Sequence, residues 1–233
     1  MQSIPALIEA QNLQFEVVGA AGRVNILKGV DLRIGPSEVV GVVGPSGSGK
    51  TSLLMLLAGL DRPTGGSLSV AGHALGDMDE DALARFRRDE VGIVFQSFHL
   101  VPTMTALENA AMPLEFAGDP DAFTRAEAAL KAVGLGHRIG HYPGQLSGGE
   151  QQRVAVARAF VALPKLILAD EPTGNLDRTT GQAVMELLFD LREKYGTTLV
   201  LITHDPALAA RCDRVLRMED GRLVADEALV PAE

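Results

Sequence analysis

The feature that most constrains this chain is the glycine-rich segment GPSGSGKT at residues 44–51. It fits the pattern G-x-x-x-x-G-K-[ST] in full, directly after the apolar run Val39–Val43 and before a helical pattern at 53–57. In such a turn, backbone N–H groups and the positive end of the new helix surround phosphate oxygens. The segment therefore predicts a phosphate-binding loop. The alternative, a glycine-rich turn with a solvated Lys50, leaves the flanking strand and helix without a purpose.

Each residue type in this loop has a chemical use. Lys50 supplies a positive charge near the β- and γ-phosphates, and Thr51 supplies a hydroxyl for magnesium. The residues expected to contact the nucleotide are Gly44, Pro45, Ser46, Gly47, Ser48, Gly49, Lys50, Thr51 and Ser52.

A second apolar run, residues 166–169, ends in two adjacent acids, Asp170 and Glu171. We expect Asp170 to complete the magnesium shell, usually through water, and Glu171 to polarise the attacking water. Two acids could instead cap the following helix, because carboxylates favour helix N-termini. The phosphate-binding loop makes the catalytic interpretation the better one.

Composition limits the class of protein. The chain has 233 residues, 46% of them hydrophobic, and a net charge of −9, which disfavours a general nucleic-acid binder. Its single Cys excludes an internal disulfide framework and a Cys-based zinc finger. The N-terminus does not resemble a secretory signal, and no apolar run approaches the roughly 18 residues that span a bilayer. We therefore expect a soluble chain that serves a membrane only through a partner.

The hydrophobic pattern indicates strands at both ends of the chain. Alternation at residues 30–34 predicts a half-exposed antiparallel strand, and residues 7–17 predict another, interrupted at Asn12. Asp220-Gly221 predicts a hairpin. From about residue 97 to 152 the pattern becomes helical.

Two helix starts can be placed within this helical stretch. Thr105 and Glu108 have the spacing of a capping box, and Asp119 followed by Pro120 predicts an N-cap with proline at the first helical position. The pattern as a whole indicates an α/β core with a helical insertion.

Further segments resemble the nucleotide-binding subunits of ABC transporters. They are LSGGEQ at 146–151, which is similar to the ABC signature with Glu150 where Gln is commoner, the Q-loop residue Gln96, the D-loop GNLD at 174–177, the switch residue His204 within Thr203-His204-Asp205, and Phe15. The matches cover almost the whole chain in the family's order.

The resemblance implies ATP and Mg²⁺ as cofactors and assigns roles by position. Gln96 would ligate the metal and assist catalysis, and His204 would contact the γ-phosphate. Asp177 would lie at the nucleotide. Phe15 would stack on adenine, where the family more often has Tyr.

The signature also has a physical rationale of its own. Ser147 and Glu150 have capping-box spacing, so Ser147 opens a helix whose next residues are Gly148 and Gly149. Bare amides at a helix start form an anion site. Because the phosphate-binding loop already serves its own nucleotide, this second site points to the γ-phosphate held by another subunit. That predicts a head-to-tail homodimer in ATP; the alternative is an ordinary capped helix in a monomer.

The implied fold is a P-loop NTPase of RecA-like α/β type, a mostly parallel sheet with an N-terminal antiparallel β subdomain and a helical insertion. Residues 1–233 would form one ATPase domain, with 1–96 and 153–233 as catalytic core and 97–152 as helical subdomain.

Finer similarity points to the LolD, MacB and FtsE branch, and closest to the YbbA type. The matching segments are 94–103, 106–109 and 169–177 for the branch, and 78–80 and 209–214 for the type. In this branch the partner is a membrane permease that resembles FtsX or MacB. We expect residues 97–109 to form the surface that grips the permease. The alternative is that these residues form an ordinary capped helix that packs on the core. The chain would sit on the cytoplasmic face of the inner membrane, drive export or extraction, and bind no nucleic acid.

Three rival functions differ in sequence features. ABC ATPases of translation usually carry two cassettes in one chain, and this chain has one. An SMC-type ATPase needs a long heptad coiled coil between Lys50 and Ser147. In this chain Gly and Pro recur in that segment, so it cannot hold one. A non-catalytic nucleotide sensor would not need Glu171 and His204. The cargo is chosen by the permease, which this chain does not contain.

We expect basal ATPase activity to rise with protein concentration, because each site needs the Ser147 of a second chain. Lys50→Ala and Ser147→Arg should each abolish turnover alone. In a mixed head-to-tail dimer one site carries both lesions and the other carries neither, so mixing the variants should restore part of the ATPase rate. No recovery despite demonstrated heterodimers would argue against shared sites.

Overall fold

The computed structural model describes residues 5–19 and 22–228, which form two compact units. The first contains the described residues up to Arg87 and from Thr198 onward, and the second is Arg88–Thr197. Helix α2 (Glu80–Glu90) carries the chain from one to the other.

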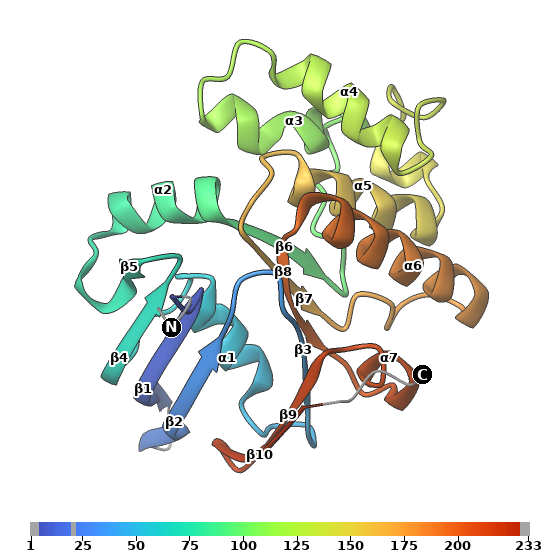
Figure 1. Cartoon of the computed structure of the whole chain (residues 1–233). Helices are drawn as coiled ribbons and strands as arrows, with labels where there is room; N and C mark the ends of the chain where they lie inside the picture. The colour runs from blue at the N-terminus through green and yellow to red at the C-terminus, as the bar shows by residue number, and fades with distance from the viewer. Residues whose placement is uncertain (1–4, 20–21, 229–233) are drawn as a thin grey trace. The chain divides into compact units, whose positions relative to one another are not determined.

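Two kinds of sheet pairing make up the first unit (Figure 1). The N-terminal sheet has the order β2-β1-β4-β5, and all its pairs are antiparallel. Its strands are β1 (Ile8–Gly19), β2 (Gly22–Ile34), β4 (Gly65–Val70) and β5 (His73–Ala74), and a short 3-10 turn, Leu75–Asp77, follows. The predicted interruption at Asn12 is a break in register between Ala10 and Leu13, where Asn12 has φ 47°.

The remaining strands of this unit have the order β10-β9-β3-β8. Strand β3 (Val39–Val43) is parallel to both β8 (Thr198–Ile202) and β9 (Arg214–Glu219), and β10 (Arg222–Ala228) returns antiparallel to β9. The predicted hairpin is confirmed: Asp220 and Gly221 both have positive φ, 45° and 74°. Two helices complete the unit, α1 (Lys50–Leu57) and the short α7 (Pro206–Ala209).

The second unit surrounds a parallel strand pair with helices. Strand β6 (Val91–Phe95) pairs with β7 (Leu166–Asp170), and α5 (Gly148–Phe160) packs against β6. Helix α5 also contacts α3 (Ala106–Phe116), α4 (Ala122–Ala132) and α6 (Arg178–Tyr195), so it lies at the centre of this unit (Figure 1). Most of its buried residues are small or β-branched, which permits close packing; they include Val154, Ala155, Val156, Ala157 and Ala159.

The predicted capping box at the start of α3 is confirmed. Thr105 accepts from the Glu108 amide, and Glu108 accepts from the Thr105 amide at 2.7 Å. The fully buried Asn109 holds the preceding loop, because its side-chain amide donates to the carbonyls of Val101, Met104 and Thr105 and accepts from the Val101 amide. Both polar atoms of its side chain therefore have partners in this loop or at the start of the helix.

The predicted start of α4 is wrong by two residues. Helix α4 begins at Ala122, its N-cap is Asp121, and no side chain caps it. The Asp119 carboxylate instead accepts from the Asp121 amide at 2.8 Å and from the Arg125 guanidinium. Asp119 therefore closes a turn before the helix, and the ion pair to Arg125 holds that turn against the first helical turn.

The predicted fold class is confirmed: an α/β protein with parallel core strands, an antiparallel N-terminal sheet and a group of helices. The predicted helical segment 97–152 lies inside the second unit, which also contains β6, β7 and α6. Its boundaries as a subdomain stay a prediction. Within residues 5–19 and 22–228, no helix is both long and apolar enough to cross a membrane.

We expect Gly92→Ala to destabilise the protein. A Cβ at Gly92 would lie 2.3 Å from the Ala159 carbonyl oxygen and 2.5 Å from Ile167 Cδ1, and backbone does not yield easily. Such overpacking costs about 1–3 kcal/mol. Urea denaturation measures the loss. Gly140→Ala is the matched control, since nothing lies within 4 Å of its Cβ; equal stability of the two variants would contradict the packing argument.

Candidate nucleotide-binding and catalytic site

The phosphate-binding loop is built from backbone that only glycine allows. Gly44 has φ 150°, and a Cβ there would lie 2.1 Å from the Met218 carbonyl oxygen in β9. Gly49 has φ 99°, and its Cβ would lie 2.8 Å from Leu27 Cδ2 in β2. A side chain at either position would displace the loop from the strands that hold it.

The hairpin turn after β9 holds the middle of the loop. The Gly221 amide donates to the Ser48 carbonyl at 3.1 Å, and the Gly221 carbonyl accepts from the Lys28 amide at 2.8 Å. Lys28 also forms a 2.5 Å ion pair with Asp220. The predicted hairpin therefore joins the antiparallel sheet to the loop.

Two features of the loop fit a phosphate group: a polar side-chain atom that lacks a partner in the described part of the chain, at Ser48, and open space beside the backbone, at Gly47. The buried Ser48 hydroxyl, 2% exposed as a residue, has no hydrogen-bond partner among the described residues. Gly47, with φ 79°, has nothing within 4 Å of where a Cβ would be. Lys50 donates to the carbonyls of Gly44 and Pro45 at 2.9 and 2.8 Å, so it uses two of its three N–H donors within the loop.

His204 and this loop both follow the carboxyl ends of neighbouring parallel strands, so they lie at the same edge of the sheet. Val42 of β3 is in register with Ile202 of β8, and the Thr203 amide donates to the Val42 carbonyl at 3.3 Å. Two residues beyond Val42 the loop begins, and two residues beyond Ile202 comes His204. The buried Thr203 accepts from the Asp205 amide at 3.0 Å and so fixes the turn that carries the exposed His204.

In the second unit, the carboxyl ends of β6 and β7 bring Gln96 and the two acids together. Phe95 is in register with Asp170, so Gln96 and Glu171 follow side by side at one edge. Glu171 has φ 43°, an unusual value for a residue with a side chain. Its carbonyl accepts from the Gly174 amide at 2.9 Å, which closes a turn directly after the acids.

Sequence reasoning missed Gln152, which connects this edge to α5. The residue is fully buried, and its side-chain amide donates to the Phe95 carbonyl at 3.1 Å and the Pro172 carbonyl at 2.5 Å. These carbonyls flank Gln96 and Glu171 in the chain. The signal was present in the sequence, as a lone amide within the apolar face of the signature helix.

The signature helix begins as predicted. Ser147 is the N-cap of α5, its side chain accepts from the Glu150 amide, and Glu150 accepts from the Ser147 amide at 2.8 Å. The second oxygen of Glu150 accepts from Arg138 at 3.0 Å. The Ser147 N–H, together with Arg138, holds the pKa of Glu150 below its ordinary value. Arg138 supplies the counter-charge for the acid that stands here in place of Gln.

The glycine pair has a reason within a single chain. A Cβ at Gly149 would lie 2.3 Å from Thr180 Cγ2 of α6, and one at Gly148 would lie 3.3 Å from Leu176 Cδ2. Close packing of α5 on α6 therefore requires Gly149. The alternative of an ordinary capped helix in a monomer therefore accounts for Gly149, and the anion site stays a prediction.

Two other predicted nucleotide contacts have structural roles. Asp177 is the N-cap of α6 and accepts from the Thr180 amide at 3.0 Å; hydrogen bonds from Thr180 lower its pKa. Phe15 lies in the buried row of β1 and is only 8% exposed, which leaves little ring surface for adenine. On the same strand, Val17 and Val18 are the exposed apolar side chains.

The predicted site residues fall into two groups. The phosphate-binding loop, Phe15 and His204 belong to the first unit; Gln96, Asp170, Glu171, Asp177 and the signature residues 147–150 belong to the second. Within each unit the predicted catalytic residues lie at the carboxyl ends of parallel strands.

The donor set suits magnesium. Among the described residues no group of three or more His, Cys, Asp or Glu could hold a metal ion. The predicted ligands are instead one carboxylate (Asp170), one hydroxyl (Thr51) and one amide (Gln96), all hard oxygen donors. Mg²⁺ typically takes one or two protein oxygens and completes its shell with phosphate and water.

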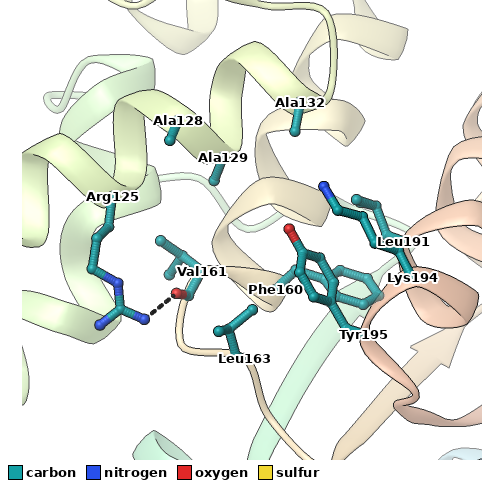
Figure 2. Close-up of a pocket in the computed structure, with 10 residues that line it drawn as sticks. All are labelled: Arg125, Ala128, Ala129, Ala132, Phe160, Val161, Leu163, Leu191, Lys194 and Tyr195. Atoms are coloured by element: carbon teal, nitrogen blue, oxygen red, sulfur yellow. Dashed lines mark hydrogen bonds between the residues drawn. The ribbon is translucent and has the colours of Figure 1, made fainter.

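A separate hollow in the second unit, of about 280 Å³, lies among α4, the end of α5 and the end of α6 (Figure 2). Phe160 and Tyr195 form its aromatic wall, with ring centroids 6.2 Å apart, and Arg125 donates to the Val161 carbonyl at 3.1 Å. None of its lining residues belongs to the motifs described above. The Cys212 thiol does not form a reactive thiolate near neutral pH, because burial raises its pKa to about 12.

The fold and the loop define an ATPase of the phosphate-binding-loop class, and comparison with known proteins narrows the class. A model of the ABC transporter family matches residues 27–174, and the chain belongs to this family, whose ATP-binding subunits are ATPases. It is 50% identical over 219 residues to the uncharacterized ABC transporter ATP-binding protein YbbA of Escherichia coli strain K12, covering 93% of this chain and 96% of that protein.

Relatives with a named system are almost as similar. The lipoprotein-releasing system ATP-binding protein LolD of Geobacter metallireducens is 48% identical over 223 residues, covering 95% of this chain and 99% of that protein. A solved structure titled as a dimeric post-hydrolysis state of the ATP-binding cassette MJ0796 with ADP and Pi has a TM-score of 0.88 and 39% identity, covering 97% of this chain and 100% of that one. The predicted family resemblance is confirmed.

We expect Glu150→Gln to reduce stability in a pH-dependent way. A carboxylate whose pKa is lowered in the folded state contributes stability above its ordinary pKa, 4.5, and loses it as the pH falls through the lower folded value. The difference in free energy of unfolding between parent and Glu150→Gln should therefore be largest at neutral pH and shrink below about 4.5. Urea titrations across the acid range measure it.

Glu127→Gln serves as the control, because Glu127 forms an exposed ion pair with Lys131 and caps no helix. A constant difference for Glu150→Gln over the whole acid range would contradict the assigned cause.

Proposed function

We propose that this protein is the ATP-hydrolysing subunit of a membrane transporter and works as a head-to-tail homodimer in ATP. The observation that carries the proposal is the position of the catalytic residues: in each unit they follow the carboxyl ends of parallel strands, as expected for a nucleotide site in an α/β protein. The resemblance to a dimeric cassette structure supports the dimer.

Each site residue has a proposed task. The amides of residues 44–49 and the ammonium of Lys50 bind the phosphates of ATP, and Thr51, Asp170 and Gln96 offer oxygens to Mg²⁺. When bound, the metal ion neutralises charge that develops on the phosphates. Glu171 accepts a proton from the attacking water, and His204 donates a hydrogen bond to the γ-phosphate.

The partner dimer chain completes the site in this proposal. The amides of Gly148 and Gly149, at the N-terminus of α5, and the hydroxyl of Ser147 address the γ-phosphate bound by the other chain. ATP thus closes the dimer, and hydrolysis followed by phosphate release opens it.

We further propose a permease of FtsX or MacB type as membrane partner, gripped by the loop before α3 and the start of α3. Similarity to proteins named for lipoprotein release supports extraction or export as the direction of work. The chain would then be peripheral on the cytoplasmic face of the inner membrane. The buried Asn109 and its bonds to the preceding loop support a preformed docking surface.

Glu171→Gln tests both catalysis and the dimer. The change keeps the size of the side chain but removes the charge, so ATP binding should persist while hydrolysis falls about a hundred- to ten-thousand-fold. The variant should elute as a dimer in ATP and as a monomer in ADP by size-exclusion chromatography.

Glu193→Gln, an exposed glutamate on α6, is the matched control and should retain the parental rate. A Glu171→Gln protein that hydrolyses ATP at nearly the parental rate would move the general base elsewhere. One that stays monomeric in ATP would remove the dimer from the mechanism.

A further inference from the structure

The amide side chains of Gln96 and Asn175 form a reciprocal pair at the catalytic edge of the second unit. Gln96 Nε2 donates to Asn175 Oδ1 at 3.1 Å, and Asn175 Nδ2 donates to the backbone carbonyl of Gln96 at 3.1 Å. Asn175 therefore contacts Gln96 through both ends of its amide, whereas its position in the chain is four residues after Glu171.

The chemistry of this pair determines which way the Gln96 amide faces. A backbone carbonyl can only accept, so the Asn175 atom next to it must be the nitrogen. The other Asn175 atom is then the oxygen, and it requires a donor from Gln96. Gln96 must present its nitrogen to Asn175, which leaves its oxygen at the opposite side of the amide. Oxygen is the atom that a magnesium ion accepts as ligand.

The surrounding backbone leaves little room for another arrangement. A Cβ on Gly174 would lie 2.7 Å from Gln96 Nε2, so Gln96 lies directly against the turn. Within this turn the Gly174 amide donates to the Glu171 carbonyl, and the Gln152 side chain donates to the Pro172 carbonyl. Gln152 also donates to the carbonyl of Phe95, the residue before Gln96, so it links the turn to the end of β6. Asn175 thus joins Gln96 to the turn that carries the catalytic acid.

We propose that Asn175 is a positioning residue that orients the Gln96 amide oxygen toward magnesium. The proposal rests on the proposed function, in which Gln96 is a metal ligand. Residues 97–109 follow Gln96 directly, so a displacement of that segment by a permease reaches the Glu171 turn through the same pair. In this proposal Asn175 acts through Gln96.

The test compares ATP affinity with and without Mg²⁺, by calorimetry in the non-hydrolysing Glu171→Gln background. Asn175→Ala should reduce the gain in ATP affinity that Mg²⁺ provides about fivefold, the effect of losing one orienting hydrogen bond. The affinity for ATP in EDTA should stay unchanged. A merely structural role would weaken both affinities together.

Gly174→Ala is a second way to break the same contact. Its methyl group would displace the Gln96 side chain from Asn175, although both amide side chains are still present in the variant. The matched control is Gln11→Ala, which removes an exposed amide that donates to Glu9 at 3.0 Å in the N-terminal sheet. It should leave the Mg²⁺ gain at the parental value.

The outcomes separate the two proposals. A parental Mg²⁺ gain in both Asn175→Ala and Gly174→Ala would overturn the positioning role and leave the proposed function standing. Absence of ATP binding by the Glu171→Gln parent, with or without Mg²⁺, would overturn the proposed function itself. Loss of the Mg²⁺ gain in the two variants, but not in Gln11→Ala, would establish the role of Asn175.

Discussion

The close approach of Gly44 to the carbonyl of Met218 is the contact on which the nucleotide-binding half depends. A Cβ at Gly44 would lie 2.1 Å from that oxygen, so any side chain would separate the loop from β9. The neighbouring bond from Gly221 to the Ser48 carbonyl joins the hairpin to the same loop. Because these contacts are between backbone atoms, they hold the loop amides in place whatever occupies the site. Preorganised amides need no rearrangement when charge develops on a phosphate, which is how such sites stabilise a transition state.

In the second unit, the main constraint is the strained backbone of Glu171. Glu171 adopts a positive φ, and its turn is fixed by hydrogen bonds to amide side chains and backbone, not by apolar packing alone. The buried Gln152 lies on α5, the helix whose N-terminus carries the signature. Its side chain donates to the carbonyls of Phe95, at the end of β6, and Pro172, in the turn after β7. A shift of α5 would therefore move the turn that carries Glu171 with it. Strain at such a residue persists only where its surroundings over-determine it.

Much of the architecture could be predicted because its determinants are local. Capping boxes at Thr105 and Ser147, the turn at Asp220-Gly221 and the interruption at Asn12 depend on residues within a few positions of one another. The start of α4 was predicted wrongly because the Asp119 carboxylate has other partners, the Asp121 amide and the Arg125 guanidinium, so it closes a turn before the helix instead of capping it. The adenine contact of Phe15 stays a prediction, and the burial of its ring could not be foreseen because it depends on strands that pair across the sheet.

The sequence by itself determined the chemistry of this protein: a phosphate-binding loop between strand and helix, two acids ending a strand, and a capped signature helix. These are short motifs whose function follows from residue type and spacing. Only the tertiary structure decided which groups hold those motifs, because Gln152, Asn175, Thr180 and Met218 are distant in sequence from at least one group that they contact. It also gave Gly149 a packing role against α6 that no local pattern reveals. Contacts between distant segments arise when elements pack, and a linear pattern carries no record of their register.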